Sequence, residues 1–387
     1  MALPLSYNVR NVIVRWKVTL LALGGISLVV AVLIALTAMA NGFRVALRAT
    51  GSPENAIVTQ RGSGSELTSG FGRDNASTIM VDPRVKRDEQ GRPMASPEIV
   101  VVAALPRKDI DTDVNVTVRG VSPMAFVVRR SVQIERGRNF TAGLYELVVG
   151  RKASERYGLD VGGTLKLQRQ TWNVVGVFSA DGNGFESEIW GDVDVLGPVF
   201  NRGGGYQSLT LRLADPSSLE AFNRDLQRNP NMQVQATSEL QYYEGQAGGT
   251  AQTLTFLAVF VGVVMGIGAV FGAMNTMYAL VAARTREIGT LRALGFSRLS
   301  ILVSFMIESA FLALVGGVIG SILALPINAL SGATGGANFS EVAFAFRVDP
   351  RWMVIAVIAA IAMGLLGGLF PAFRAARTPI TAALRDV

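Results

Sequence analysis

The chain contains no cysteine and no histidine among its 387 residues. Disulfides, thiol or imidazole catalysis and the usual zinc sites are therefore excluded, because each needs one of these side chains. Lysine is scarce as well, and the lysines are Lys17, Lys86, Lys108, Lys152 and Lys166. None of them follows a glycine, so no G-x-x-x-x-G-K-[ST] phosphate-binding loop can be drawn, and we expect any ATPase to be another polypeptide.

Charge is nearly absent from four long apolar runs, which are residues 18–40, 253–283, 299–330 and 352–373. Each run is longer than the roughly 20 residues that cross a hydrocarbon core of about 30 Å. None contains an aspartate, which argues against an intramembrane aspartyl protease, and the one acid within them is Glu308. Half of the chain is apolar and only 17% is charged. These features predict a polytopic α-helical membrane protein with four transmembrane helices.

The net charge of +7 indicates membrane topology, and no basic groove with interleaved aromatic residues suggests nucleic-acid binding. Short basic segments precede the first run, separate the second from the third and follow the fourth, so these segments and both termini are expected in the cytoplasm of a bacterium. The resulting order is a cytoplasmic segment 1–17, spans 18–40, 253–283, 298–330 and 352–373, an extracytoplasmic domain 41–252, a cytoplasmic helix 284–297, a short outer loop 331–351 and a cytoplasmic tail 374–387.

The N-terminus imitates a cleavable signal peptide, because a basic start and an apolar run precede Ala38-Met39-Ala40. The apolar core of such a signal is only about 7 to 15 residues long. The run here is longer, so we expect it to remain as a membrane anchor.

The segment 41–252 alternates strand-like and helix-like patterns, which predicts an α+β domain of two lobes. Its Gly248-Gly249 pair is a candidate flexible joint next to the second span. We expect strands at 55–61, 98–103, 114–118, 132–135, 147–150, 165–168, 172–178, 208–213 and 232–236, and helices at 123–129, 151–157 and 216–227.

A short charged segment, Arg284 to Gly295, lies between the second and third runs. As a helix it would place Ile288, Leu291 and Leu294 on one side, while its arginines would leave it basic enough to meet an acidic partner or lipid head groups. Gly295 would end this helix and Ser297 would cap the next one.

The sequence of this segment resembles the RTREIG-x-LRALG signature of the permease superfamily that includes the macrolide exporter MacB, the lipoprotein-releasing proteins LolC and LolE and the cell-division protein FtsX. The large domain between the first two spans is closest in layout to MacB-type permeases. The resemblance implies a porter-like lobe with an inserted, mostly β lobe at 146–207. It also assigns ATPase coupling to Arg284, Arg286, Glu287, Ile288, Gly289, Leu291, Arg292, Leu294 and Gly295.

The family resemblance implies the transmembrane subunit of a type VII ABC transporter, which is itself no enzyme and holds no cofactor or metal. It would act as a homodimer with two copies of an ATP-binding subunit that binds ATP and Mg. Export with a periplasmic adaptor and an outer-membrane channel is the first expectation. Lipoprotein extraction, or FtsX-like signalling to a cell-wall hydrolase, are the alternatives.

Polar residues and glycines inside the spans form a second set of candidates. Glu308 either stays hydrated or paired with an arginine near the cytoplasmic face, or has a substrate or proton role. Asn275 is expected to hydrogen-bond between helices, and glycines four residues apart to let helices approach closely. The paired glycines are Gly262 with Gly266, Gly268 with Gly272, Gly316 with Gly320, and Gly364 with Gly368. The end of the chain resembles the family's closing motif through Pro371, Arg374, Ala375, Arg377, Pro379, Leu384 and Arg385.

Overall fold

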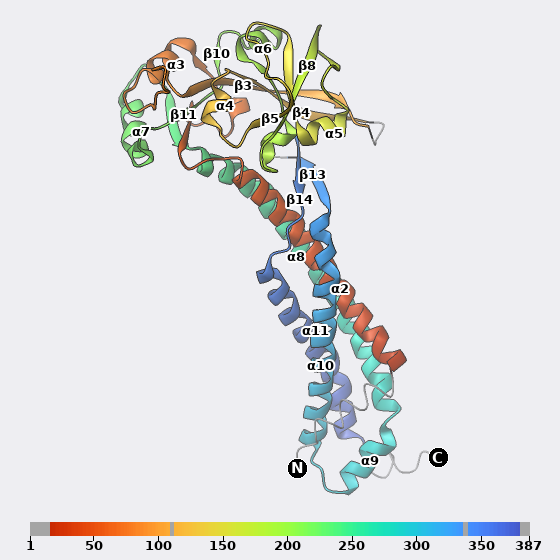
Figure 1. Ribbon diagram of the computed structural model, residues 1–387. Coiled ribbons are helices and arrows are strands. Elements are labelled where there is room, and N and C mark those ends of the chain that lie inside the picture. The colour runs from red at the N-terminus through yellow and green to blue at the C-terminus, as the bar shows by residue number, and fades with distance from the viewer. Residues whose placement is uncertain (1–15, 109–111, 336–339, 380–387) are drawn as a thin grey trace. The chain divides into compact units, whose positions relative to one another are not determined.

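The computed structural model describes residues 16–108, 112–335 and 340–379 (Figure 1). The chain divides into two compact units. The membrane unit comprises residues up to Asn41, Thr253–Leu330 and the residues from Phe346 onward. The external unit comprises Gly42–Gln252 and Ser331–Ala345. The chain therefore passes between the units four times.

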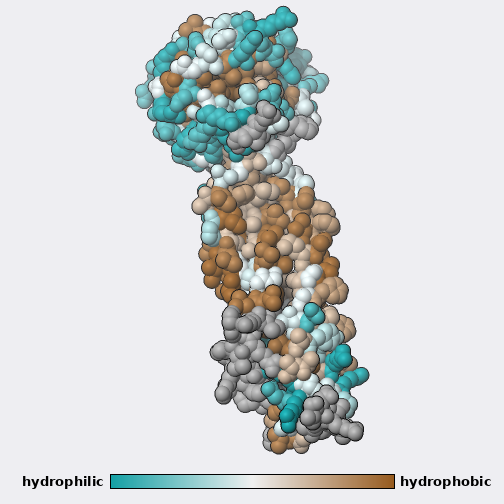
Figure 2. Space-filling model, turned by 90° about the vertical axis from the view of Figure 1, so that its right-hand side faces the viewer, coloured by the Kyte–Doolittle hydropathy of each residue, from teal (hydrophilic) through white to brown (hydrophobic). Residues whose placement is uncertain are grey.

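Within the described residues, four helices are long and apolar enough to cross a membrane, as the sequence predicts. On the face shown in Figure 2, hydrophobic side chains cover most of their surface. This arrangement, with a large α/β domain between the first two spans, confirms the expected fold class. The spanning helices are α2 (Trp16–Arg48), α8 (Glu239–Ala282), α10 (Arg298–Ala324) with the short 3-10 turn η4 (Leu325–Ala329), and α11 (Pro350–Arg377). The short helix α9 (Thr285–Ala293) lies between α8 and α10 in the sequence.

Two of the spanning helices extend well beyond the apolar runs that predict them. Helix α2 continues through Asn41 and Gly42 to Arg48, and α8 begins at Glu239, before the expected start at 253. With 44 residues, α8 is about 66 Å long at 1.5 Å per residue. It stays helical through Gly248 and Gly249, so the expected joint is not a break in the helix.

Glycines bring the spanning helices of the membrane unit into close contact. A side chain on Gly320 would approach the carbonyl oxygen of Ser27 to 2.5 Å, and one on Gly316 would approach Ile26. Gly262 and Gly266 face Leu33 and Met363, and Gly364 and Gly368 both face Ser309. Gly268 and Gly272 have open space around them within this chain, so three of the four predicted pairs lie at close approaches and packing at this pair stays a prediction.

The external unit is built on a mixed sheet with the strand order β12-β1-β11-β3-β4-β9-β6-β8-β5, and β7 pairs with β8 outside this path. Pairs β4–β9 and β6–β8 are parallel, and the other pairs are antiparallel. The strands are β1 (Asn55–Gln60), β3 (Ala95–Pro106), β4 (Asp113–Val121), β5 (Gln133–Gly137), β6 (Glu146–Gly150), β7 (Thr164–Leu167), β8 (Gln170–Ser179), β9 (Ile189–Asp192), β11 (Ser208–Arg212) and β12 (Val234–Ser238). Every strand expected from the sequence is therefore present.

Helices and short turns cover this sheet. They are η1 (Glu66–Thr68), α3 (Arg73–Met80), α4 (Ala125–Val128), α5 (Arg151–Tyr157), η2 (Gly184–Ser187), α6 (Val193–Val199), η3 (Pro216–Ser218) and α7 (Leu219–Arg228), with a small ladder of β2 (Phe71–Gly72) and β10 (Gly205–Tyr206). Helix α3 lies in a segment that carries no clear pattern in the sequence. Its Ala76 and Ile79 pack in a core with Phe222 of α7.

The sheet has separate hydrophobic cores along its length. One core lies among β1, β11, β12 and α7, and others lie around Trp172 and Trp190. Strands β3 and β4, which precede residue 146, contribute to the core around Trp172. The exact limits of an inserted lobe at 146–207 therefore stay a prediction.

The expected outer loop 331–351 contains regular structure. Residues Ser331–Gly335 (β13) and Glu341–Ala345 (β14) form an antiparallel hairpin that belongs to the external unit. Helix α11 then begins at Pro350, where the side chain of Asp349 accepts a hydrogen bond from the backbone N–H of Arg351 at 2.9 Å.

Candidate functional site

The corner between α9 and α10 is determined by local sequence. Gly295 has a φ of +94°, a left-handed conformation that glycine adopts without strain. The N–H groups of Phe296 and Gly295 donate to the carbonyls of Leu291 and Arg292 at 3.1 and 3.2 Å, which is the Schellman arrangement that ends a helix. Ser297 then accepts a hydrogen bond from the N–H of Ser300 at 3.2 Å and caps α10.

Helix α9 is held against the other helices of the membrane unit by an apolar core and by two arginines, Arg284 and Arg292. Ile288 is 3% exposed and packs with Met277, Leu280 and Val281 of α8, with Ile301 and Phe305 of α10, and with Ala372 and Ala375 of α11. The guanidinium of Arg292 donates to the backbone carbonyl of Ala376 at 2.8 Å. A cation at the end of a helix is favourable, because the last carbonyls carry partial negative charge. The coupling segment and the closing motif are thereby brought together.

Arg284 forms a buried ion pair with Glu308. Its Nη1 lies 2.8 Å from Glu308 Oε2, and the two side chains are 3% and 4% exposed. Glu308 is thus paired with an arginine, which is the simpler of the two interpretations of this residue. Arg284 therefore adds little to the exposed charge of the segment, and the contact of this basic segment with an acidic partner or lipid head groups stays a prediction.

The outward surface of α9 is smaller than the sequence suggests. Arg286, Glu287 and Thr290 are exposed, and Leu294 is 71% exposed. The sequence places Leu294 on the same side of the helix as Ile288, but Leu294 is the C-cap residue, and the chain turns away immediately after it. Leu291 is half-buried and Gly289 is buried.

The remaining predicted site residues are more scattered. Asn275 lies on the exposed face of α8, so a hydrogen bond from it to another helix would require a molecule outside this chain. Pro371 and Ala375 are buried, the guanidinium of Arg374 lies 5.9 Å from the ring of Tyr278, and that of Arg377 lies 4.0 Å from Phe373. Pro379 is exposed, whereas Leu384 and Arg385 lie outside the described residues.

Glu308→Ala is expected to destabilise the membrane unit by about 3–5 kcal/mol, because it leaves the Arg284 guanidinium buried without this carboxylate. Replacing both residues by methionine should restore most of the loss, since a well-packed apolar pair often equals a buried ion pair. Yield and thermal stability of the purified full chain measure both effects. A stable but inactive double variant would instead support a direct role of Glu308 in the transported substrate's path or in proton movement.

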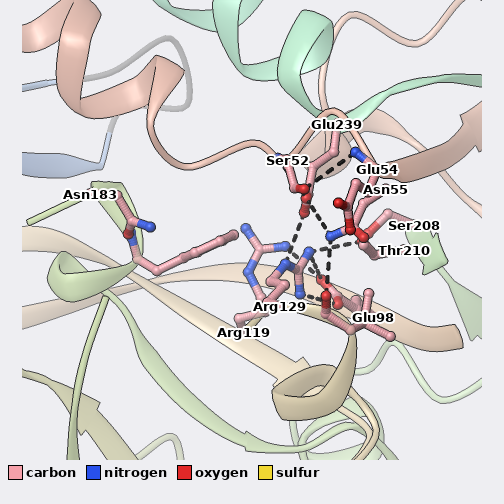
Figure 3. Close-up of polar contacts among 12 residues, drawn as sticks. Ser52, Glu54, Asn55, Glu98, Arg119, Arg129, Asn183, Ser208, Thr210 and Glu239 are labelled. Carbon is pink, nitrogen blue, oxygen red and sulfur yellow. Dashed lines mark hydrogen bonds and ion pairs between the residues drawn. The ribbon is translucent and has the colours of Figure 1, made fainter. Parts of the chain in front are cut away.

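The external unit contains a buried ionic network that the sequence does not predict, and Figure 3 shows the part of it around Arg129, Glu98 and Glu239. Arg119 lies 2.8 Å from Glu66, 2.9 Å from Glu98 and 2.8 Å from Glu188. Arg129 pairs with Glu98 and, at 2.9 Å, with Glu239. Five of these side chains are no more than 2% exposed, namely those of Glu66, Glu98, Arg119, Arg129 and Glu239.

Neutral groups complete the network. Ser208 donates to Glu66 at 2.6 Å, Thr210 accepts from Arg129 at 2.8 Å, and the side-chain amide of Asn55 donates to Glu239 at 2.9 Å. Burial by itself would raise the pKa of Glu66, but the charge and hydrogen bonds of Arg119 lower that pKa below its usual value. Glu66 therefore stays ionised.

Glu239 links the network to helix α8, because it is the first residue of that helix. The N–H of Ser52, in the turn after α2, also donates to its carboxylate, at 3.1 Å. The start of α8 is thus bound to β3 through Arg129 and Glu98. The sequence contains one signal for this network, which is a charged residue inside each of two apolar strands. These residues are Glu98 in β3 and Arg119 in β4.

Two family models match the chain, one over most of the membrane unit and one mainly over the external unit. The family model described as FtsX-like permease C-terminal matches residues 259–380. The model described as MacB-like periplasmic core domain matches residues 19–229, more than half of the chain. The chain belongs to the MacB-like, FtsX-like family of ABC transporter permeases.

Individual relatives are similar over most of the chain. The macrolide export ATP-binding/permease protein MacB of Brucella abortus (strain 2308) is 28% identical over 392 residues, which cover 96% of this chain and 58% of that protein. The uncharacterized ABC transporter permease YknZ of Bacillus subtilis (strain 168) is 25% identical over 71% of each chain. The chain spans about half the length of the MacB relatives that it matches.

Among solved structures, the periplasmic region of MacB from Actinobacillus actinomycetemcomitans matches with a TM-score of 0.38 and 13% identity, covering 54% of this chain and 95% of that one.

Proposed function

We propose that this chain couples ATP hydrolysis by a separate ATP-binding subunit to movement of its external unit, and that the transporter exports a substrate. The observation that carries the proposal is helix α8, a single helix whose first residue lies in the buried ionic network and whose last turns pack on α9. A displacement of α9 would therefore act directly on α8, and α8 on the sheet of the external unit.

The proposed partners follow from the same arrangement. Two ATP-binding subunits, which would hold ATP and Mg, would each seat on one α9 of a permease homodimer. In this scheme both termini and α9 lie in the cytoplasm, and the external unit lies beyond a bacterial inner membrane. A periplasmic adaptor and an outer-membrane channel would complete an export path.

The orientation can be measured with single cysteines, because the chain has none of its own. A cysteine at the exposed Thr68 is expected to react with a membrane-impermeant maleimide in whole cells, and one at the exposed Thr290 only after the cells are opened. Reversed labelling would contradict the scheme.

The coupling is tested by reconstituting the full chain in lipid nanodiscs with an ABC ATP-binding subunit. ATP hydrolysis is expected to rise at least several-fold in the presence of the chain, and to rise further when a transported molecule is added. Hydrolysis that is the same with and without the chain would exclude coupling.

A second candidate, lipoprotein extraction, is favoured by one feature of the membrane unit. A hollow of about 540 Å³ lies between α2, α8 and α11, and Gly262, Gly266, Val263, Ile267 and Met363 are among the residues that line it. Such a hollow suits an acyl chain, because its lining is almost entirely hydrocarbon. Stimulation of ATP hydrolysis by an acylated protein, but not by its unacylated form, would favour extraction over export of small molecules.

A further inference from the structure

The β13–β14 hairpin connects two spans of the membrane unit but belongs to the external unit. It lies in the chain between η4 and α11, and its strands pair from Ser331 with Ala345 to Gly335 with Glu341. Its residues contact segments of the external unit that are far away in the sequence.

Glu341 is the centre of these contacts. Its Oε1 accepts hydrogen bonds from Arg107 at 3.0 Å and from Arg156 at 2.8 Å, and its Oε2 accepts one from the hydroxyl of Tyr157 at 3.1 Å. The carboxylate is 14% exposed and the two arginines are 20% and 23% exposed. Burial, followed by the nearby carboxylate, raises the pKa of the Tyr157 hydroxyl, which therefore remains a donor.

The residues beside Glu341 add hydrogen bonds to other elements. Ser340 accepts one from the hydroxyl of Thr117 in β4 at 2.8 Å. The N–H of Ala343 donates to the hydroxyl of Ser187 at 2.9 Å, and its carbonyl accepts from the ammonium of Lys152 at 3.2 Å. Ser340 and Ala343 are each only 4% exposed.

Apolar contacts hold the C-terminal end of β14 against α2. The ring of Phe344, 1% exposed, lies edge-on to the fully buried Phe43, with ring centroids 5.7 Å apart. A side chain on Gly42 would overlap the carbonyl oxygen of Ala345, so glycine is required there for the approach. Gly42 and Phe43 belong to α2.

We propose that the β13–β14 hairpin is a fixed anchor, which stays bound to the external unit through Glu341 throughout the transport cycle and so makes the third and fourth spans follow that unit. Opening the hairpin contact would expose the buried Phe43 and Phe344 to water. It would also leave Arg107 and Arg156 near each other without the Glu341 carboxylate that both of them contact. The conformational change of the transport cycle would then have to occur outside the hairpin contact. The part of this proposal that concerns the cycle rests on the proposed function.

A disulfide across the hairpin contact tests whether it opens. The double substitution Thr117→Cys and Ser340→Cys places two thiols where hydroxyl oxygens lie 2.8 Å apart, in a chain with no other cysteine. Oxidation of the full chain in nanodiscs should form the bond nearly completely. The oxidised chain is expected to stimulate its ATP-binding subunit within about twofold of the reduced one. Loss of stimulation on oxidation that reductant restores would overturn the anchor.

Hydrogen exchange of the full chain tests the role of Glu341 without any partner. Glu341→Gln is expected to speed amide exchange in β14 at least about tenfold, whereas Glu155→Gln, which removes an exposed acid on the same helix as Arg156, should leave it unchanged. Equal exchange in the two variants would show that Glu341 does not hold the hairpin.

The two measurements separate the two hypotheses. If the unsubstituted chain stimulates no ATP-binding subunit, the proposed function fails, and hydrogen exchange still decides whether Glu341 holds the hairpin. If stimulation is normal but Glu341→Gln leaves exchange unchanged, the anchor alone fails.

Discussion

Arg119→Met is expected to lower the free energy of unfolding of the external unit by about 3–5 kcal/mol, because it leaves buried carboxylates without their counter-ion. Glu66, Glu98 and Glu188 would all lose the guanidinium between them. For a unit of this size the midpoint of thermal unfolding should fall by roughly 6 to 20 °C. The fluorescence of the buried Trp172 and Trp190 reports this transition in the purified full chain.

The matched control is Arg136→Met. Arg136 also pairs with an acid, Asp160 at 2.8 Å, but the two side chains are 48% and 60% exposed. Exposed pairs contribute little, because water screens them, so no measurable shift is expected. If Arg119→Met and Arg136→Met melt together, the buried network does not stabilise the external unit. Should Arg119→Met fail to fold, Thr210→Val removes one hydrogen bond to Arg129 and should give a smaller shift in the same direction.

Leu294→Asp is expected to weaken the binding of the ATP-binding subunit at least about tenfold and to abolish its stimulation. Leu294 is 71% exposed at the end of the helix that also carries the exposed Arg286 and Glu287, and burying a leucine at an interface contributes about 1.5–3 kcal/mol. A carboxylate in its place would also have to lose water on binding. The measurements are the affinity of the two subunits and the rate of ATP hydrolysis in nanodiscs.

The control for this change is Val81→Asp, which converts an equally exposed residue of the external unit, 66% exposed, into an acid. It should leave both measurements unchanged. Normal stimulation by the Leu294→Asp chain would place the docking surface away from the end of α9. Arg292→Ala is less informative, because Arg292 donates to the carbonyl of Ala376 and its loss would also disturb α11.

The features that the sequence predicts well are those decided by neighbouring residues. The spans follow from uninterrupted apolar length, and the corner after α9 follows from Gly295 and Ser297, each of which acts within a few residues of its own position. Leu294 shows the limit of periodicity, because a spacing of three is meaningful only while the helix continues.

Ion pairs between residues that are far apart in the sequence could not be predicted, and the reason is physical. Arg119 and Glu66 are 53 residues apart, and Arg129 and Glu239 are 110 apart, so only the folded sheet brings them together. The same holds for Arg284. Its neighbours in the sequence indicate a surface charge, and only the packing of α8 and α10 places Glu308 beside it. The hairpin at 331–345 was missed because its stabilising partners, such as Arg107 and Arg156, lie in another part of the chain.

The continuity of α8 also sets an angular relation between its two ends. Each residue of an α-helix advances by about 100° around the axis, so Glu239 and the packing residues Met277 and Val281 hold fixed directions around one cylinder. One residue inserted between them would turn one end by about 100° relative to the other, whereas seven residues would nearly restore the direction, to within about 20°, and lengthen the helix by about 10 Å. Under the proposed coupling, α8 would transmit rotation as well as displacement, and the phase of its sequence would be a property on which the coupling depends.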